Sequence, residues 1–397
     1  MYKKLILILN CGSSSIKFTI INSLNNDKII TGVSEYIKKK KHIIKWKINN
    51  IINKKKIFLN YNILKFIFTS IILKNKKISN KLCSIGHRIV HGGELFHNSV
   101  IINDKIINSI KKYISFAPIH NIEHLIGIYN SFKFLPNLFK KNVAVFDTAF
   151  HQSIPKKSFL YALPYNLYKK YKIRRYGAHG ISHKFLTSET SKFLNIKKKK
   201  LNIITCHLGN GCSISAIKNG KCIDTSMGLT PLEGLIMGTR CGDIDPSIIF
   251  YLHNNLGIKI KEIDKILNKE SGLLGLSEIS NDCRYIEKNY KNNPKLKLAI
   301  KIFCYKLTKY IGSYSVLMHD HLDAIVFTGG IGENSVLIRK LTINSLNFLD
   351  FKIDNVLNKK INYTKYGIIT KSKSRISLVI PSNEELIIAK DTNKLIN

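Results

Sequence analysis

The chain has 397 residues, of which 44% are apolar and 10% aromatic, so it can build packed cores, and its length favours two domains. No run of residues approaches the roughly 18 apolar residues of a membrane-spanning helix, so we expect a soluble protein with no membrane partner. The formal net charge of +39 would suit nucleic acid, but almost all of it is lysine scattered among Ile and Asn. We interpret the charge as compositional bias and expect no specific nucleic-acid partner.

The first 35 residues are predicted to form three strands. An apolar run over residues 5–9 breaks at Asn10 into Cys-Gly-Ser-Ser-Ser, and apolar and polar residues then alternate. This pattern indicates two strands joined by a turn of the size that holds a phosphate. Residues 25–27 form the next turn, and residues 36–80 mix strand with amphipathic helix.

The remainder of the first half alternates strands, loops and helices. The expected elements are a strand over 85–90, loops at 91–93 and 117–121, a helix over 123–132, a strand over 142–146 and an irregular crossover over 151–185. Asp147 comes directly after the last of these strands.

A near-copy of the first hairpin opens the second half at residues 201–217, with His207–Gly211 as its turn. After it we expect a hairpin turn at 218–221, helices over 245–256, 259–268 and 294–317, a buried strand over 323–327, a glycine-rich loop over 328–334, a strand over 377–380 and a terminal helix. The repeat suggests a duplicated nucleotide-handling fold, and strands that alternate with helices indicate an α/β architecture.

Arginine is scarce, and three arginines lie in Gly-, Asp- or His-rich surroundings: Arg88, Arg240 and Arg284. A guanidinium can bind a carboxylate or a phosphate with two parallel hydrogen bonds, which lysine cannot do. These positions are therefore candidates for anion recognition.

Six motifs in this order closely resemble the acetate kinase family over the whole chain: residues 10–17, 86–93, 146–151, 207–211, 237–246 and 329–334. The resemblance implies two duplicated actin-like (ribonuclease-H-like) α/β domains with mixed sheets flanked by helices and a nucleotide cleft between the domains. It implies an N-terminal domain of residues 1–150 plus 382–397, and a C-terminal domain of 151–381 that forms a homodimer.

The resemblance also implies reversible, Mg²⁺-dependent transfer of the γ-phosphoryl group of ATP to acetate, giving acetyl phosphate and ADP. Arg240 would bridge the carboxylate and the phosphoryl group, His179 would donate to the transition state, and Asp147 matches an essential acid. Because acetate has no proton to remove, we expect Asp147 to orient an arginine or a metal-bound water rather than act as a base.

By the same resemblance, the acid substrate would contact Arg88, Val90, Ile119, His120 and Pro231, with Ala178 also lining the methyl pocket. The nucleotide would contact Ser13, Ser15, Lys17, His207, Leu208, Gly209, Asn210, Gly211, Asp282, Cys283, Arg284, Gly330, Ile331, Gly332, Glu333 and Asn334. Asn10 and Glu384 match the positions that hold Mg²⁺, which Mn²⁺ could replace, and Glu385 is the neighbouring alternative.

Other functions stay open at this point. A propionate or butyrate kinase of the same family is the nearest, since Ala178 stands where some relatives carry a larger aromatic side chain. A nucleic-acid-binding protein and a chaperone-type ATPase are the others. The eight cysteines include no CxxC pair and predict reduced thiols in the cytoplasm.

Overall fold

The structure is a computed structural model that describes residues 4–12, 15–37, 41–58, 62–319, 321–361 and 365–396, without the side chains of residues 37, 41, 118 and 119. It divides into two compact units, here called unit 1 (Met1–Phe150 with Asn383–Asn397) and unit 2 (His151–Ser382). None of the helices described has the length and apolar character needed to cross a membrane.

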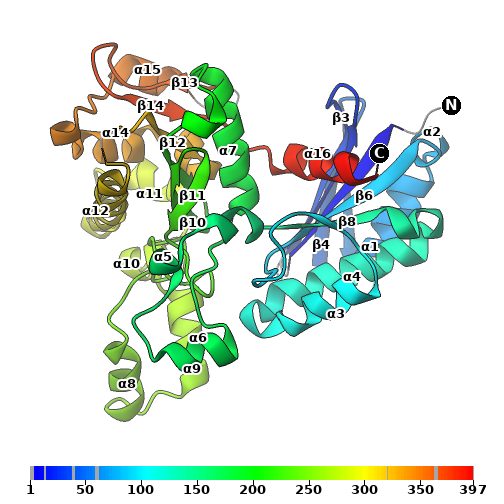
Figure 1. Ribbon diagram of the computed structural model, residues 1–397, viewed down its shortest axis with the longest axis horizontal. Helices are drawn as coiled ribbons and strands as arrows, with labels where there is room; N and C mark the ends of the chain where they lie inside the picture. The colour runs from blue at the N-terminus through cyan, green and yellow to red at the C-terminus, as the bar shows by residue number, and fades with distance from the viewer. Residues whose placement is uncertain are drawn as a thin grey trace. The chain divides into compact units, whose positions relative to one another are not determined.

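Unit 1 is built on an eight-stranded sheet with the order β5-β4-β3-β2-β1-β6-β8-β7 (Figure 1). Its strands are β1 (Leu5–Cys11), β2 (Ser15–Asn22), β3 (Lys28–Ile37), β4 (Lys41–Ile48), β5 (Ile51–Phe58), β6 (Leu82–Ile89), β7 (Val100–Ile101) and β8 (Asn142–Phe146). Its helices are α1 (Ile63–Phe66), η1 (Ile67–Leu73), α2 (Lys76–Ser79), α3 (Asp104–Lys112), η2 (Ile114–Phe116), α4 (Pro118–Phe134), η3 (Pro136–Lys141) and α16 (Glu384–Ile396). The short η4 (Ala149–Ser153) runs from unit 1 into unit 2.

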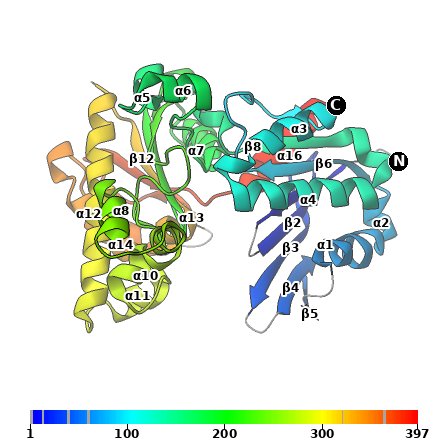
Figure 2. The same cartoon turned by 90° about the horizontal axis from the view of Figure 1, so that it is seen from below.

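Both faces of β1 and β6 are covered, because α4 and α16 pack on opposite sides of them (Figures 1 and 2). Successive side chains of a strand point to opposite faces. Gly127 of α4 lies against Cys11 of β1, whereas Gly86 of β6 lies against Ile388 and Thr392 of α16. Strands covered on both faces read as continuous apolar runs, which explains the sequence of residues 5–9.

Unit 2 is built on a six-stranded sheet with the order β11-β10-β9-β12-β14-β13. Its strands are β9 (Ile203–Leu208), β10 (Cys212–Lys218), β11 (Lys221–Thr225), β12 (Ala324–Thr328), β13 (Gly367–Ile368) and β14 (Ile376–Val379). Its helices are α5 (Lys156–Phe159), α6 (Tyr165–Tyr171), α7 (Gly180–Phe193), η5 (Lys198–Lys200), α8 (Ser247–Asn254), α9 (Ile260–Lys265), η6 (Ile266–Glu270), α10 (Gly272–Ser277), α11 (Cys283–Asn289), α12 (Pro294–Leu317), α13 (Gly329–Asn334), α14 (Val336–Asn344), η7 (Asn347–Leu349) and α15 (Asn355–Lys360).

The two sheets repeat one topology. In unit 1 the antiparallel run β3-β2-β1 continues into parallel β6 and β8, and in unit 2 the antiparallel run β11-β10-β9 continues into parallel β12 and β14. Each sheet ends on a short antiparallel edge strand, β7 or β13. The duplicated α/β organisation predicted from the two hairpins is therefore present in the topology.

Three predicted loops contain helices. The segment 117–121 is mostly the first turn of α4, which starts at Pro118. Proline is tolerated there because the backbone N–H that it lacks has no partner within the helix at the first position. The glycine-rich segment 328–334 contains α13, and the crossover 151–185 contains α5, α6 and the start of α7. The loop assignments at these places were wrong, while the strands that precede them were correctly predicted.

Candidate active site

Arg88 is the centre of a polar cluster in unit 1. Its side chain leaves β6 and donates to Asp147 Oδ2 from Nε at 3.1 Å and from Nη2 at 2.5 Å. Nη1 donates to Asn10 Oδ1 at 3.3 Å, and Glu384 Oε2 lies 3.9 Å from Nε. Burial lowers the pKa of the Arg88 guanidinium, but the negative charges of Asp147 and Glu384 raise it by more, so the pKa lies above its ordinary value. Arg88 is thus a fixed cation held by residues from three other segments of the chain.

The loop after β6 is fixed by two side chains that the motifs did not single out. Asn121 of α4 accepts from the N–H of His91 at 3.2 Å and donates to its carbonyl at 3.0 Å. Thr148 accepts from the N–H of Gly92 at 3.1 Å. Val90, in the same loop, is buried. Sequence reasoning missed these bonds because Asn121 and Thr148 are far from residue 91 along the chain.

The start of α4 carries two of the predicted substrate contacts. His120 lies on the first turn and is half-buried, and the side chain of Ile119 lies outside the described part of the structure. Because His120 is helical, its side chain projects from a regular turn instead of from an irregular loop.

The oxygen atoms around Arg88 match what a magnesium ion needs. Asn10, Asp147 and Glu384 offer one amide and two carboxylate side chains within the same cluster. Among the described residues no group of three or more His, Cys, Asp or Glu is placed to hold a metal. Mg²⁺ usually keeps several waters and takes only one or two protein carboxylates together with substrate phosphates. The donor set therefore fits that ion.

The turn after β1 is described only in part, because Ser13 lies outside the described residues. Gly12 donates from its N–H to the carbonyl of Ser15 at 2.8 Å, which closes the turn between β1 and β2. Ser15 is half-buried at the start of β2, and Lys17 is exposed on the same strand.

In unit 2 the hairpin β9-β10 has one apolar and one polar face. Ile204, Cys206, Ile214 and Ala216 belong to a core that includes α12. On the other face Thr205, His207 and Ser213 lie toward α7. This alternation brings hydroxyl and imidazole groups next to the helix.

Four histidine contacts connect that polar face to α7. His183 connects two hydroxyl groups: its Nδ1 lies 2.7 Å from Thr205 Oγ1, and its Nε2 lies 2.8 Å from Ser213 Oγ. Ser213 Oγ also lies 2.9 Å from His179 Nδ1. Ser182 Oγ lies 2.8 Å from His207 Nδ1. The rings of His179 and His207 stack with centroids 4.2 Å apart, so both Nδ1 atoms are fixed by hydroxyl groups.

His179 also has an unusual backbone. It precedes α7 with φ 56° and ψ 22°, a left-handed conformation that costs free energy for a residue with a side chain. Such strain is typical of functional positions. Burial lowers the pKa of the neighbouring His183 well below its ordinary value, so this supporting ring is neutral near pH 7.

Arg240 approaches the same place from an irregular loop. A Cβ atom added to Gly211 would lie 3.5 Å from His179 Cε1 and 3.6 Å from Arg240 Nη1, so the two side chains converge over this glycine. Arg240 Nη1 donates to the carbonyl of Pro231 at 3.2 Å. Within the described part of the chain no carboxylate forms an ion pair with Arg240, and burial lowers the pKa of its guanidinium.

A network of side chains fixes the loop that carries Arg240 and Pro231. Glu233 Oε1 accepts from Arg175 Nη2 at 2.6 Å, and its other oxygen accepts from the hydroxyl of Tyr161. That hydroxyl accepts in turn from the N–H of Leu229 at 2.9 Å. The loop has no regular secondary structure over residues 226–246. Backbone bonds also fix it at Arg240, whose carbonyl accepts from the N–H of Met237 at 3.2 Å, while the N–H of Cys241 donates to the carbonyl of Leu267 at 3.0 Å.

A cavity of about 750 Å³ in unit 2 gathers most of the predicted adenosine contacts. Its lining includes Gly209, Asn210, Asp282, Cys283, Arg284, Gly330, Ile331 and Asn334, together with Asn281, Glu287, Lys288, Ser335 and Val336, which the motifs did not indicate. Asp282 caps α11 and holds the exposed Arg284 through a bond of 2.7 Å.

Five predicted nucleotide contacts of unit 2 are not in this lining. His207 and Gly211 belong to the histidine cluster, whereas Leu208 and Gly332 are buried. Glu333 belongs neither to the cavity lining nor to the histidine cluster. Its Oε1 accepts from the N–H groups of Gly329 and Ser382, both at 2.9 Å. Glu333 therefore connects the start of α13 to the segment after β14.

Comparison with known proteins gives one consistent result. The model of the acetokinase family matches residues 5–390. The chain is 57% identical to the acetate kinase of Wigglesworthia glossinidia brevipalpis over 99% of both chains. Among solved structures it is similar to a propionate kinase from Francisella tularensis, with TM-score 0.92, 45% identity and 99% and 100% of the two chains covered. It is also similar to Porphyromonas gingivalis acetate kinase, with TM-score 0.91, 37% identity and the same coverage.

Proposed function

The chain belongs to the acetokinase family and has its two-domain actin-like kinase fold, and from this we propose that it transfers the γ-phosphoryl group of ATP to acetate. The products are acetyl phosphate and ADP, and the reaction is reversible. The observation that carries the proposal is Arg240, a half-buried guanidinium that converges with His179 over Gly211 and has no carboxylate partner among the described residues. An anionic substrate would supply the missing partner.

The chemistry needs no general base. The carboxylate of acetate is ionised at neutral pH and attacks the γ-phosphorus directly, while the bond from that phosphorus to the bridging oxygen of ADP breaks. The protein must hold two anions together and neutralise charge on the transferring group. Arg88 would bind the carboxylate, and Arg240 would contact both the carboxylate and the phosphoryl group.

Three further residues would assist these cations. His179, with Nδ1 held by Ser213, would direct its Nε2 proton to an equatorial phosphoryl oxygen, and His207 would act beside it. Asp147 would keep Arg88 in place, since its Oδ2 accepts from both Nε and Nη2 of that guanidinium. A carboxylate so placed is suited to orientation and not to proton removal.

Mg²⁺, or Mn²⁺ in its place, would be held near Asn10 and Glu384, where it would neutralise the phosphates of ATP. Adenosine would occupy the cavity between α11 and α13, beside Gly330 and Ile331. The glycines of the β9-β10 turn allow the backbone to approach the phosphates closely.

Propionate is the second candidate substrate, because one similar structure is a propionate kinase and Ala178 and Val90 are small side chains. One methylene in a small apolar pocket changes the preference by about 1–3 kcal/mol. The test is acyl phosphate formation from ATP and acetate, propionate or butyrate, trapped with hydroxylamine with and without Mg²⁺. We expect acetate to give the highest kcat/KM and the reaction to require the metal. Equal or higher rates with butyrate would overturn the assignment.

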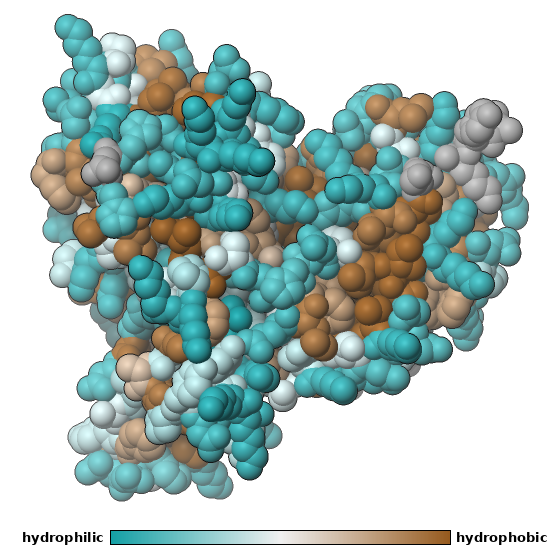
Figure 3. Space-filling model, viewed as in Figure 1, coloured by the Kyte–Doolittle hydropathy of each residue, from teal (hydrophilic) through white to brown (hydrophobic). Residues whose placement is uncertain are grey.

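A homodimer is proposed from α8. This helix presents Ile248, Phe250 and Tyr251 at 41%, 65% and 58% exposure, and none of its residues is buried. Figure 3 shows apolar residues among hydrophilic ones where α8 lies in Figure 1. An exposed apolar face of this kind is typical of a protein interface, and a second copy of the chain would cover it.

The proposed location is the cytoplasm. All eight cysteines lie in described parts of the chain and none forms a disulfide, and burial raises the pKa of several, for example to about 12 at Cys212. Such thiols are protonated and unreactive. Cell fractionation followed by immunodetection would test this location.

A further inference from the structure

One face of the unit 1 sheet is open over β2 to β5, and it carries a line of exposed lysines that begins beside the Arg88 cluster. Asn10 pairs with Lys17 across β1 and β2, Lys17 pairs with Val33 of β3, and Val33 pairs with Lys45 of β4. Lys45 in turn pairs with Lys54 of β5. Directly paired residues point to the same face of a sheet, so these lysines share one face with Asn10.

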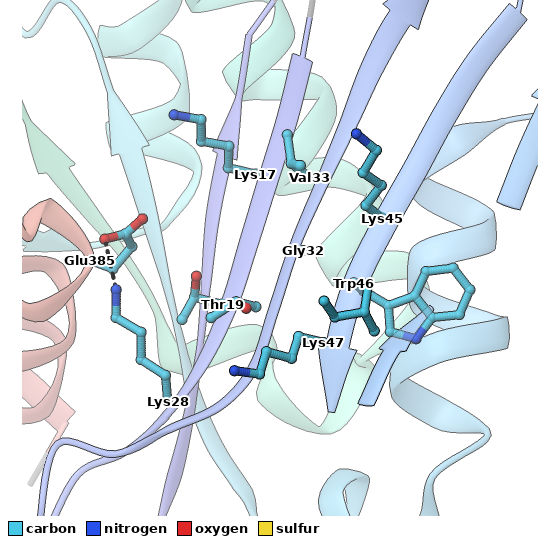
Figure 4. A pocket seen from close by; sticks show the side chains of 11 residues that line it. Lys17, Thr19, Lys28, Gly32, Val33, Lys45, Trp46, Lys47 and Glu385 are labelled. Carbon is cyan, nitrogen blue, oxygen red and sulfur yellow. Dashed lines mark hydrogen bonds and ion pairs between the residues drawn. The ribbon is translucent and has the colours of Figure 1, made fainter. Parts of the chain in front are cut away.

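A second row adds to the charge. Thr19, Thr31 and Lys47 pair across β2, β3 and β4. Between the two rows lies a hollow of about 370 Å³, whose lining includes Lys17, Lys28, Lys45 and Lys47 (Figure 4). Glu385 is the only acid in that lining, which leaves a surplus of three positive charges, four lysines less one glutamate.

Most of this charge is not neutralised within the chain. Lys28 lies 3.5 Å from Glu385 Oε2. In the part of the chain that the structure describes, no side chain forms an ion pair with Lys17, Lys45 or Lys47, and Glu35 farther along β3 forms none either. Lysines directly opposite each other, as Lys45 and Lys54 are, repel one another. A bound anion would relieve that repulsion.

We propose that this hollow is an oligophosphate-binding site, separate from the adenosine cavity of unit 2, with Lys28, Lys45 and Lys47 as its main ligands and Lys17 at its edge. An oligophosphate concentrates several negative charges in a volume that the hollow can hold, and ammonium groups bind phosphate as point charges. The hydroxyls of Thr19 and Thr31 lie at its floor, where they can donate hydrogen bonds. The source is either an inorganic oligophosphate or the triphosphate tail of a nucleotide.

Single-stranded nucleic acid fits the face less well. Proteins that bind it stack bases on aromatic side chains. The one aromatic residue in the lining, Trp46, turns to the opposite face, where its ring meets Phe66 edge to face at 6.1 Å (Figure 4). The lining of the hollow therefore offers charge and hydroxyl groups but no stacking platform.

The test is calorimetric titration of tripolyphosphate into the full chain already saturated with Mg²⁺ and ADP, so that the unit 2 cavity is filled. The Lys45→Gln/Lys47→Gln variant is compared with Lys111→Gln/Lys112→Gln, which removes the same charge from exposed positions of α3 in the same unit. We expect the first variant to bind about 10-fold more weakly than the unsubstituted chain, and the second to stay within about 2-fold.

Equal losses in both variants would show that only net charge matters and would overturn the site. So would the absence of any tripolyphosphate binding to the ADP-saturated chain, or tighter binding of a short RNA than of tripolyphosphate. Parallel titrations with ATP and with adenosine identify the source, since a triphosphate tail predicts that ATP binds and adenosine does not. Kinase turnover at saturating substrate is expected to be unchanged in Lys45→Gln/Lys47→Gln, which separates this test from the proposed function.

Discussion

Arg88 and Arg240 are both half-buried, but their charges are neutralised differently. Asp147 lies 2.5 Å from Arg88, whereas Arg240 has no carboxylate partner among the described residues. A buried charge without a partner costs stability. In Arg240→Ala we therefore expect turnover to fall about 10³-fold while the thermal midpoint stays the same or rises. Steady-state kinetics and thermal melts measure the two effects.

The matched control is Arg375→Ala, which removes an exposed arginine from the same unit and should change neither quantity. Turnover close to that of the unsubstituted chain in Arg240→Ala would contradict the assigned role. A large fall in its thermal midpoint would instead indicate that Arg240 stabilises the fold.

Buried histidines make stability depend on pH. Burial lowers the pKa of His87 from 6.5 to about 4, against the smaller opposite effect of its bond to Asn142. Between these values the unfolded chain binds a proton that the folded chain does not, so stability falls as pH drops through this window. The loss from His87 alone approaches about 3 kcal/mol near pH 4.

The variant His87→Gln removes this titration. We expect its free energy of unfolding, measured with urea, to depend less steeply on pH between about 6.5 and about 4 than that of the unsubstituted chain. His97→Gln, at an exposed position of unit 1, serves as the control and should keep the original slope. An unchanged slope in His87→Gln would contradict the account.

At the scale of elements, Glu233 is one of the side chains that hold the irregular loop 226–246, through its bonds to Arg175 and Tyr161. Glu233→Gln keeps the shape of the side chain but removes the charge that pairs with Arg175. Because the loop presents Arg240 and Pro231, we expect KM for acetate to rise and kcat to fall about 10-fold, with KM for ATP little changed. Steady-state kinetics with each substrate varied in turn measures this split.

Glu262→Gln, on the exposed surface of α9, is the control for Glu233→Gln. If both KM values rose together in Glu233→Gln, the loop would affect the whole unit and not the acid substrate in particular.

Elements with strong periodicity were predictable from the sequence, and short helices rich in glycine or proline were not. The hairpin β9-β10 is visible as alternating residues around a Gly-Asn-Gly turn. The helix α13 contains three glycines, which disfavour helix in isolation, and in the structure Glu333 accepts a hydrogen bond from its first N–H. The pairs Asn121 with His91 and Ser213 with His179 join distant segments, so no local pattern indicates them.

At the scale of the whole molecule, the exposed apolar helix α8 predicts self-association. We expect Phe250→Glu to convert a dimer into a monomer, because it places a charge in the centre of an apolar contact. Sedimentation equilibrium measures the mass directly. Phe348→Glu replaces an aromatic that is 78% exposed in η7 and should leave the mass unchanged; a dimer that survives Phe250→Glu would place the interface elsewhere.

The central claim is that the γ-phosphoryl group of ATP is transferred to a carboxylate. Its most direct test is a ³¹P NMR time course of the purified chain with ATP, Mg²⁺ and acetate. We predict that the γ-phosphate signal decays while signals of acetyl phosphate and ADP grow in equal amounts, and that none of this occurs without acetate. Release of inorganic phosphate at the same rate with or without acetate would contradict the claim.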